Sequence, residues 1–519
     1  QGKAVQLEAT KLPGISISQE ARRFYPNREL AAHLLGFANV DGKGIEGVEL
    51  MLEDKLRGST RTSPAVLDRR GVVVYSEQML DDNSGQGNEV TLTIDKTIQH
   101  IVERELELAV RTSEAHAGTV VVLDPSQGEI LAVANFPTFN PNEPQRASTG
   151  ERRNRAIMDR FEPGSTLKPF TVAGAFAANA IAPTAQIDCQ QGTMIVDGIA
   201  IHDTHHWGVL TPAEIIAMSS NIGASKIGQA LGRPGLYRAL SRFGFGVPTG
   251  LGLPGEMSGV LHPYQHWYSM DAATIPFGQG MSTTTLQLAM AMGALANQGR
   301  LMEPQLVKRV VDAHGQTIQE AVPRIRKQVV PESVARMLTD MLVGVTGEGG
   351  TGTEAAIDGY LVAGKTGTAQ KADPHGGYSK EKWTSSFIGY APAQKPRLVV
   401  AVVIDEPMIV HLGGAVAAPT FRRIMEASLR YLGVPADATG TLAEQLRARR
   451  AQIPVVAANN APINEPPQTL QPNEVLVPNL IGKTAREAVI LANRAQFTLR
   501  MQGSGLVSAQ HPIASSVAT

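Results

Sequence analysis

The sequence predicts an α+β fold. Short strand-like apolar runs gather toward both ends of the central part of the chain, and segments with helical periodicity lie mostly between them. Two of the runs flank Pro125-Ser126-Gln127-Gly128, a set of turn-forming residues, so we expect a hairpin there. Strands and helices that gather in separate stretches of a chain are typical of this fold class. The expected strands are 91–94, 118–123, 129–134, 360–363, 386–390 and 398–404, and the expected helices include 171–180, 211–218 and 420–432.

Four regions follow from composition along the 519 residues, a length that exceeds what one hydrophobic core usually serves. Residues 1–92 mix short apolar runs with Gly, Arg and Asp, and we expect an extended accessory region. Regular packing begins near residue 93, where Asp95 is a plausible N-cap for a helix, and it continues through 435. Residues 436–474 are rich in Ala, Pro, Asn and Gln, which indicates a linker. Residues 475–519 regain a compact pattern of strand, turn, helix and strand, as in a small module.

Overall composition excludes some classes of partner and site. Lys and Arg number 47 against 48 Asp and Glu, so no broad basic surface for nucleic acid is expected. The single cysteine, Cys189, can form neither an intrachain disulfide nor a cysteine-based metal site, and we expect a core or surface thiol. The longest apolar run, 398–404, is strand-sized, whereas a membrane helix needs about 20 apolar residues. The chain opens at Gln1 without a Met, so we expect that it derives from a longer precursor.

Ser165 and Lys168 form the first motif that can carry chemistry. They are three residues apart, just before an apolar helix, and this spacing places both side chains on one helical face. Pro169 fits the first turn, where its missing N–H has no intrahelical partner. A serine hydroxyl is a weak nucleophile until a base removes its proton, and a lysine can be that base if burial or nearby cations lower its pKa.

The same spacing occurs a second time, in Ser379 and Lys382. That pair lies in a Gly-rich, charged stretch with no apolar helix after it, so nothing there would desolvate the lysine. We interpret it as a solvated surface loop.

A second motif, Ser219-Ser220-Asn221, follows the expected helix 211–218. It can be an ordinary helix terminus. In a functional interpretation, Ser219 relays a proton between the lysine and a leaving group, and the Asn221 amide holds a substrate backbone.

The third motif, Lys365-Thr366-Gly367-Thr368, lies on an expected strand. Gly367 removes a side chain, which would let a substrate approach the strand closely. Lys365, Thr366 and Thr368 can offer a positive charge and hydroxyls to a carboxylate, and a free backbone N–H at Thr368 can help to bind an oxyanion. An ordinary strand end is the alternative.

Three histidines lie close together with an aspartate, as His202, Asp203, His205 and His206. Their spacing matches no known metal motif, and a serine nucleophile with a lysine base needs no metal. We therefore interpret the stretch as a loop and expect neither a metal nor a cofactor.

Together the motifs form the Ser-x-x-Lys, Ser-x-Asn and Lys-Thr-Gly set of penicillin-binding proteins and related β-lactamases, with Ser219 54 residues and Lys365 200 residues after Ser165. The chain resembles class B penicillin-binding proteins, particularly the transpeptidases of cell division. The resemblance includes residues 22–26 and 44–49 in the accessory region, 92–95 at the start of the main domain, 277–280 and 363–370. Residues 475–519 look like one PASTA module, a small β-α-β unit.

This resemblance implies a transpeptidase domain with an antiparallel sheet flanked by helices, after an N-terminal pedestal. It implies that Ser165 is acylated by the penultimate D-Ala of a peptidoglycan stem peptide, with Lys168 as base, Ser219 as proton relay and Asn221 as peptide holder. Lys365, Thr366 and Thr368 would bind the donor carboxylate, and the N–H groups of Ser165 and Thr368 would form the oxyanion hole. β-Lactams would acylate the same serine.

The resemblance also implies a membrane setting and partners. Family members usually carry an N-terminal membrane helix before the first residues of this chain, with the catalytic domain on the periplasmic or extracellular side. A membrane glycosyltransferase and other division proteins would be the partners.

Other functions stay open at this stage. A β-lactamase or β-lactam sensor shares the three motifs, but a lactamase needs a further base to activate water, and no local motif identifies one. A D,D-carboxypeptidase differs only in letting water replace the acceptor amine. A catalytically idle scaffold that binds peptidoglycan or division partners is the alternative from another class.

Overall fold

The computed structural model describes residues 22–58, 64–69, 73–76, 86–373 and 376–437, with residues 475–476, 480, 488, 492 and 517–518. The chain divides into two compact units, residues 1–450 and 451–519. The predicted linker lies almost wholly outside the described residues, and so does most of the predicted terminal module. In that module, β17 (Val475–Leu476) pairs antiparallel with β18 (Val517–Ala518).

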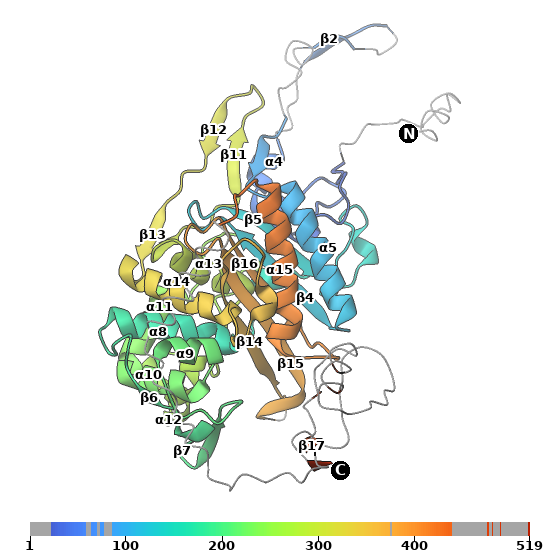
Figure 1. Ribbon diagram of the computed structural model, residues 1–519. Coiled ribbons are helices and arrows are strands. Elements are labelled where there is room, and N and C mark those ends of the chain that lie inside the picture. Colours follow the sequence, from blue (N-terminus) through green and yellow to red (C-terminus); the bar gives the residue numbers. More distant parts are fainter. Residues whose placement is uncertain are drawn as a thin grey trace. The chain divides into compact units, whose positions relative to one another are not determined.

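A five-stranded antiparallel sheet forms the centre of the larger unit, in the order β14-β15-β16-β4-β5 (Figure 1). The hairpin of β4 and β5 comes early in the chain and β14 to β16 come late, so the pairing of β16 with β4 joins segments far apart in sequence. The strands are β4 (Ala117–Leu123), β5 (Ile130–Phe136), β14 (Ala363–Ala372), β15 (Tyr378–Ala391) and β16 (Leu398–Asp405).

Helices cover both faces of this sheet, so its central strands are apolar at nearly every position. Val120 and Val122 of β4 point into a core with α5 (Lys96–Thr112) and α15 (Gly413–Tyr431). Val121 and Leu123 point into a second core with α13 (Thr285–Ala296), a helix whose residues are all buried. This alternation, with period two, is that of an extended strand.

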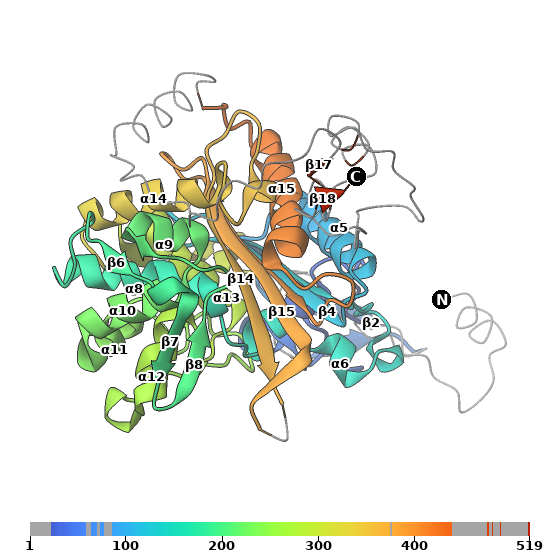
Figure 2. The ribbon, with the colours of Figure 1, turned by 60° about the horizontal axis from the view of Figure 1, so that its bottom comes forward.

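Most of the remaining helices occupy the long segment between β5 and β14, to which α13 also belongs. Figure 2 shows α8 to α11 beside the β14 edge of the sheet. Besides α13, the helices of this segment are α6 (Thr149–Arg152), α7 (Arg155–Met158), α8 (Lys168–Ala177), α9 (Pro212–Met218), α10 (Asn221–Leu231), α11 (Arg233–Arg242), α12 (Ser269–Thr274) and α14 (Glu332–Thr346). Short strands complete it: β6 (Ile187–Asp188), β7 (Thr193–Val196), β8 (Ile199–His202), β9 (Val209–Leu210), β10 (Arg300–Met302), β11 (Val307–Val311), β12 (Thr317–Glu320) and β13 (Ile325–Gln328).

The predicted α+β class is confirmed, and so are the hairpin and the helix after Asp95, whose carboxylate accepts hydrogen bonds from the N–H groups of Thr97 and Ile98. The predicted strand 360–363 is wrong in its start. A turn with Gly359 at φ 83° precedes an isolated bridge at Tyr360, and β14 begins only at Ala363.

The predicted helix 420–432 also begins too late. In the structure α15 starts at Gly413 and continues through Pro419. A proline usually marks a helix start because it lacks an N–H, but burial of Ala417, Ala418 and Phe421 against the sheet outweighs that local preference.

Within the accessory region, residues 22–58 are compact and not extended as expected. Residues 22–58 form α2 (Ala32–Leu35), α3 (Gly47–Met51) and α4 (Glu53–Leu56). The hydrophobic core that contains α13 also includes three buried apolar residues of this segment, Leu34, Val48 and Leu52. The described strands of the first 92 residues are β1 (Ala65–Leu67), β2 (Val73–Ser76) and β3 (Glu89–Leu92). Of these, β3 pairs with β11.

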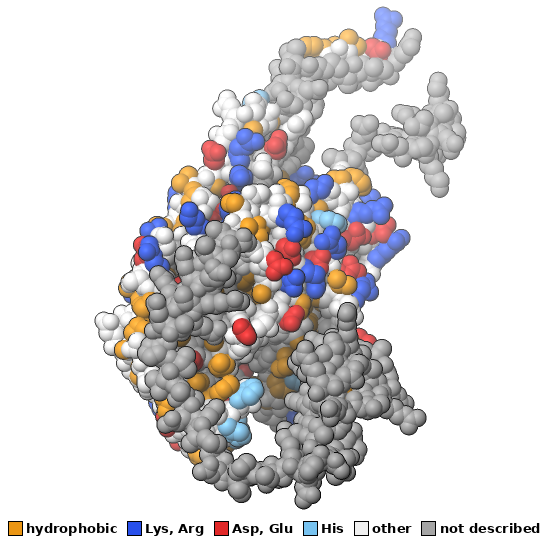
Figure 3. All heavy atoms as spheres, in the orientation of Figure 1, with side chains coloured by type: hydrophobic (Ala, Val, Ile, Leu, Met, Phe, Trp, Pro, Cys, Tyr) orange, Lys and Arg blue, Asp and Glu red, His pale blue; other side chains and the backbone are white. Residues whose placement is uncertain are grey.

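Positive and negative side chains are mixed on the face that carries α5 and α15 (Figure 3). None of the helices in the described part of the chain combines the length and apolar character that crossing a membrane requires.

Candidate active site

Ser165 lies in a short 3-10 turn (Gly164–Leu167) that leads directly into α8. Gly164 has φ 52°, a left-handed conformation that side chains disfavour, and an added Cβ would lie 3.2 Å from the Thr368 carbonyl oxygen of β14. Glycine therefore lets the turn lie against the strand. Ser165 is half-buried, and its backbone N–H has no partner within the described chain.

A loop at residues 275–280 supports this turn from another side. Gly164 N donates to Gly278 O at 3.0 Å, and Thr171 Oγ1 of α8 donates to Pro276 O at 2.8 Å. A Cβ on Gly278, at φ 91°, would lie 2.1 Å from Gly164 O. The two backbones thus fix the position of the serine through a contact that only glycine permits.

Ser219 occupies the sharp junction between α9 and α10. Its backbone is left-handed, with φ 63° and ψ 38°, which is uncommon for a residue other than glycine. Strained backbone of this kind tends to cluster at functional sites. Ser220 then caps α10 by accepting a hydrogen bond from Gly223 N at 2.9 Å. The junction turns both the carbonyl and the hydroxyl of Ser219 toward Lys168, which donates to both.

Two lysines converge on that junction. Lys168 Nζ donates to Ser219 Oγ at 3.2 Å and to Asn221 Oδ1 at 2.9 Å, and Lys365 Nζ donates to Ser219 Oγ at 3.0 Å. Both lysines have 0% exposed surface. Four of the predicted site residues, Lys168, Ser219, Asn221 and Lys365, are therefore in direct contact. Within the described chain Ser165 Oγ makes no hydrogen bond to them.

Burial controls the charge of both lysines. It lowers the pKa of Lys168 well below its ordinary value, and the nearby Lys365 cation lowers that pKa further, whereas the Asp203 carboxylate raises it. Burial also lowers the pKa of Lys365 to about 7. A lysine whose pKa is lowered in this way is neutral for an appreciable part of the time and can accept a proton.

The third motif lies on β14, the edge strand nearest the serine turn. Thr366 is buried, and its hydroxyl is 2.9 Å from that of Thr351. Thr368 Oγ1 accepts a hydrogen bond from Gly413 N at 3.0 Å, which leaves its own hydrogen free to donate to a ligand. Of the two threonine hydroxyls, Thr368 is thus the better placed to meet a carboxylate.

Gly367 is also required by packing, a reason that the sequence did not reveal beside the predicted approach of a substrate. An added Cβ would lie 2.4 Å from Ser386 Oγ and 2.8 Å from Thr166 Cγ2. The bare backbone therefore lets β14 fit between its neighbour strand and the serine turn.

Asp203 is a site residue that the sequence did not reveal. Its Oδ1 accepts hydrogen bonds from the backbone N–H groups of Asn221 and Ile222, the latter at 3.1 Å, and its Oδ2 accepts from the Ser220 hydroxyl at 2.6 Å. The preceding residue, His202 of β8, accepts a hydrogen bond from Asn221 Nδ2 through its carbonyl at 2.9 Å. This aspartate thus holds the Ser219–Asn221 junction. No local pattern points to it, because it lies 16 residues before Ser219.

The other candidates in this part of the chain have structural explanations. Cys189 is buried with its sulfur 3.4 Å from Ser220 Oγ, and burial raises its pKa. His205 and His206 lie in a loop, as predicted, whereas His202 is the last residue of β8. The described residues contain no group of three or more side chains that could hold a metal ion.

The second Ser-x-x-Lys lies on the surface, as predicted, but in β15 and not in a loop. Lys382 is largely exposed and pairs with Glu406 at 3.3 Å. Residues 378–383 of β15 extend beyond the pairing with β16 and pair only with the end of β14.

Family models match two parts of the chain. The penicillin-binding protein transpeptidase domain matches residues 118–426, and the penicillin-binding protein dimerisation domain matches residues 1–92. The transpeptidase model covers more than half of the chain and includes all three motifs.

Individual relatives agree with these models. A probable peptidoglycan D,D-transpeptidase PenA of Neisseria gonorrhoeae is 40% identical over 433 residues, 83% of this chain and 72% of that protein. The peptidoglycan D,D-transpeptidase FtsI of Escherichia coli K12 is 38% identical over 436 residues, 84% of this chain and 71% of that protein.

Solved structures show the same fold. Penicillin-binding protein 3 of Mycobacterium tuberculosis in its apo form matches with a TM-score of 0.71 and 32% identity, over 80% of this chain and 93% of that one. The transpeptidase domain of Burkholderia pseudomallei penicillin-binding protein 3 matches with a TM-score of 0.60 and 36% identity, over 66% of this chain and 97% of that one. The chain therefore belongs to the class B penicillin-binding protein transpeptidases, enzymes of the peptidoglycan D,D-transpeptidase type.

Proposed function

We propose that Ser165 is the nucleophile of a peptidoglycan D,D-transpeptidase and that Lys168 is its base. The observation that carries this proposal is the pair of fully buried lysines that donate to the Ser219 hydroxyl. Lys168 begins the helix directly after the serine turn, and Lys365 lies on β14. A buried lysine with a lowered pKa is what an unactivated serine requires.

In the first half-reaction Lys168 accepts the Ser165 proton while Oγ attacks the carbonyl carbon of the penultimate D-Ala of a stem peptide. The N–H groups of Ser165 and Thr368 stabilise the oxyanion. The peptide bond breaks, and the terminal D-Ala leaves after its amine takes a proton from Lys168 through Ser219. Asn221 holds the donor backbone, and Lys365 with Thr366 and Thr368 binds the donor carboxylate.

In the second half-reaction an amine of another stem peptide attacks the acyl-enzyme. A new amide bond forms, the ester bond to Ser165 breaks, and one amine proton passes through Lys168 to Ser165 Oγ. β-Lactams acylate the same serine and leave it blocked.

The cellular setting is part of this proposal. We infer a role in septal wall synthesis, a single N-terminal membrane anchor upstream of the chain, and a catalytic domain on the outer side of the membrane. Residues 1–92 would form a pedestal, residues 93–435 the transpeptidase domain, residues 436–474 a linker and residues 475–519 a PASTA-like module. A membrane glycosyltransferase and division proteins would be the partners. The similarity to FtsI supports this setting.

Intact mass after incubation with benzylpenicillin tests the proposal. We expect a stoichiometric adduct that persists for hours, is absent from Ser165→Ala and is retained in Ser379→Ala, the matched serine of the second Ser-x-x-Lys. Rapid loss of the adduct with hydrolysed drug would indicate a β-lactamase. Complete absence of an adduct would support a non-catalytic scaffold. Products formed from a donor peptide with an added amine separate a transpeptidase from a carboxypeptidase.

A further inference from the structure

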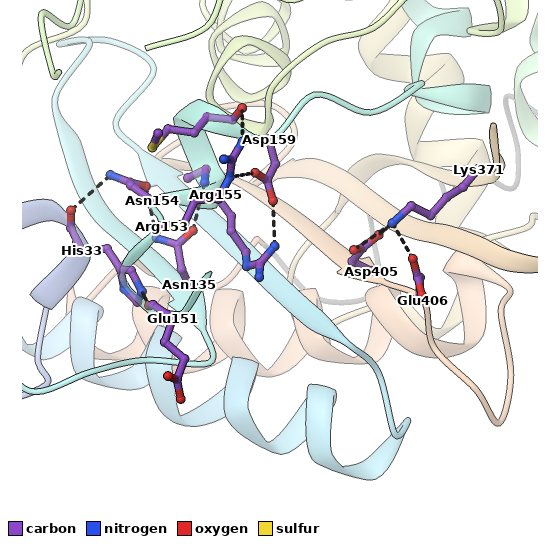
Figure 4. A network of polar contacts seen from close by, with 12 residues as sticks. His33, Asn135, Glu151, Arg153, Asn154, Arg155, Asp159, Lys371, Asp405 and Glu406 are labelled. Carbon is purple, nitrogen blue, oxygen red and sulfur yellow. Dashed lines mark hydrogen bonds and ion pairs between the residues drawn. The ribbon is translucent and has the colours of Figure 1, made fainter. Parts of the chain in front are cut away.

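Asn154 lies where the segment that leads to the serine turn meets the accessory region. It occupies the N-cap position of α7 and is only 6% exposed, yet its side chain accepts no hydrogen bond from that helix. An asparagine at this position usually caps the helix with its own oxygen. Here Nδ2 donates to His33 O at 3.4 Å, and Oδ1 accepts from Asn135 Nδ2 at 3.2 Å (Figure 4). The amide is therefore used for contacts with distant segments.

Asn135, on β5, supplies the missing cap from another element. Its Oδ1 accepts a hydrogen bond from Ala156 N, in the first turn of α7, at 2.9 Å. The buried Asn135 thus caps the helix, while Asn154 is free to contact the accessory region. Because both amides are buried, replacing either one would leave polar groups without a partner. The pair fixes the start of α7 against the central sheet.

His33 is a well-held partner for Asn154. Its ring is buried and packs edge-on against Phe139, with ring centroids 5.2 Å apart. Burial lowers the pKa of His33 to about 4, so the ring is neutral near pH 7. Its Nε2 donates to the Glu151 carbonyl oxygen at 2.7 Å. His33 therefore contacts the chain before the serine turn at two residues, Glu151 and Asn154.

Two ion pairs make the next residues a compact unit. Arg155 Nη1 lies 2.9 Å from Asp159 Oδ2, and Arg153 also pairs with Asp159 (Figure 4). Arg153 Nη2 donates to Met158 O at 3.2 Å. The two arginines thus close the segment 153–159 on itself, so a shift at its start would move the whole unit.

The chain before the serine turn has few other anchors. Ile157 O accepts a hydrogen bond from Met257 N at 3.0 Å, and Phe161 exchanges two backbone hydrogen bonds with Thr283, at 3.0 and 2.9 Å. Apart from the cap on α7, the backbone of residues 155–160 makes no further hydrogen bond to a distant segment of the described chain. The placement of the serine turn therefore depends on how the start of this segment is held.

We propose that Asn154 is a positioning residue for the nucleophile, because it fixes the segment that leads to Ser165 against His33 of the accessory region and Asn135 of the sheet. A misplacement of reacting atoms by about 1 Å can slow a reaction about 100-fold. The groups proposed to bind the donor lie on β14 and at the 219–221 junction, so loss of the Asn154 contacts slows acylation without weakening binding. The inference rests on the proposed role of Ser165.

The test measures acylation of the full chain by benzylpenicillin over a range of concentrations. The limiting rate constant reports the placement of the nucleophile, and the concentration at half this limit reports binding. For Asn154→Ala we expect the limiting rate constant to fall about tenfold, while the half-saturating concentration stays within about twofold.

Asn142→Ala is the matched control. Asn142 also joins the accessory region to the rest of the chain, because its Oδ1 accepts from Tyr25 N at 3.0 Å and its Nδ2 donates to Tyr25 O at 2.8 Å. In the described chain its side chain makes no hydrogen bond to residues 153–164. We expect both alanine variants to lower the midpoint of thermal unfolding, since each loses hydrogen bonds to the accessory region, but Asn142→Ala to leave both kinetic constants unchanged.

Asn154→Asp decides the question if the alanine variant does not fold. It keeps the shape of the side chain and the acceptor for Asn135, and it removes only the donor to His33 O, so the limiting rate constant still falls. Unchanged limiting rate constants in the Asn154 variants would overturn the inference, and so would an equal fall in Asn142→Ala or a change in binding alone. Failure of the unmodified chain to form any adduct would instead contradict the proposed function, and this inference with it.

Discussion

Lys168 and Lys365 donate hydrogen bonds to one oxygen, Ser219 Oγ, at 3.2 and 3.0 Å, although neither lysine has exposed surface. Two ammonium groups that share a buried hydroxyl repel each other, so the site favours states in which one of them is neutral. The pKa values of both lysines are lowered, chiefly by burial.

Acylation should depend on the protonation of Lys168. The rate constant for acylation by benzylpenicillin should rise with pH as Lys168 loses its proton. This rise should occur at a pH well below 10.5, the ordinary pKa of a lysine. Lys365→Met removes a neighbouring cation that lowers the Lys168 pKa, so the rise moves to higher pH. Acylation rates from pH 5 to 10 check this. A rise at the same pH in both proteins would show that the two lysines are not coupled.

Lys365→Met should also make the fold more stable. The folded-state pKa of Lys365, about 7, lies below its ordinary value of 10.5, so the unfolded chain binds more protons between these values and stability rises with pH across this window. Below pH 7 the buried cation is destabilising in full. We expect the free energy of unfolding of the variant to be about 1–3 kcal/mol higher near pH 7 and to depend less on pH. Urea unfolding at pH 6, 8 and 10 measures both.

The control for that variant is Lys382→Met, at the largely exposed lysine on β15. It should change stability by no more than about 0.5 kcal/mol at any of these pH values. Equal pH dependence in Lys365→Met and the unmodified chain would contradict the buried-cation explanation.

Asp203→Asn should shift the acylation profile in the opposite direction. The Asp203 carboxylate raises the Lys168 pKa, so its neutral isostere moves the rise to lower pH. The variant also weakens the hydrogen bonds to Ser220 and Asn221, and we expect acylation to slow by about 10- to 100-fold from misplacement of the junction. Asp188→Asn, at an exposed position on β6, is the control. A slower rate with an unshifted profile would assign Asp203 a purely structural role.

Gly367→Ala should destabilise the protein through a steric clash. The new Cβ would lie 2.4 Å from Ser386 Oγ and 2.8 Å from Thr166 Cγ2, and overpacking of this kind costs about 1–3 kcal/mol. Adding Ser386→Ala removes the nearer atom and should restore part of the loss. Gly344→Ala in α14, whose nearest neighbour atom is 4.0 Å away, should instead be neutral or stabilising. Thermal unfolding of the four proteins checks this, and no recovery in the double variant would rule out the Ser386 contact as the cause.

The sequence was a sufficient guide where neighbouring residues carry the information. The apolar runs of β4 and β16 predict strands because both faces of the sheet are covered, and Asp95 predicts a helix start because its carboxylate reaches N–H groups only two and three residues later. Lys168, Ser219, Asn221 and Lys365 were identified from their motifs, and the structure brings them into contact.

The tertiary structure alone decided the features that depend on contacts between distant segments. Asp203, directly after β8, reaches the Ser219–Asn221 junction, and Gly367 fits against Thr166 and Ser386. Local patterns in the sequence reflect hydrogen bonds and packing within a few residues. Which side chain meets which across the fold is set by how the sheet and helices pack, so the burial of the two lysines and their lowered pKa values appear only once the chain is folded.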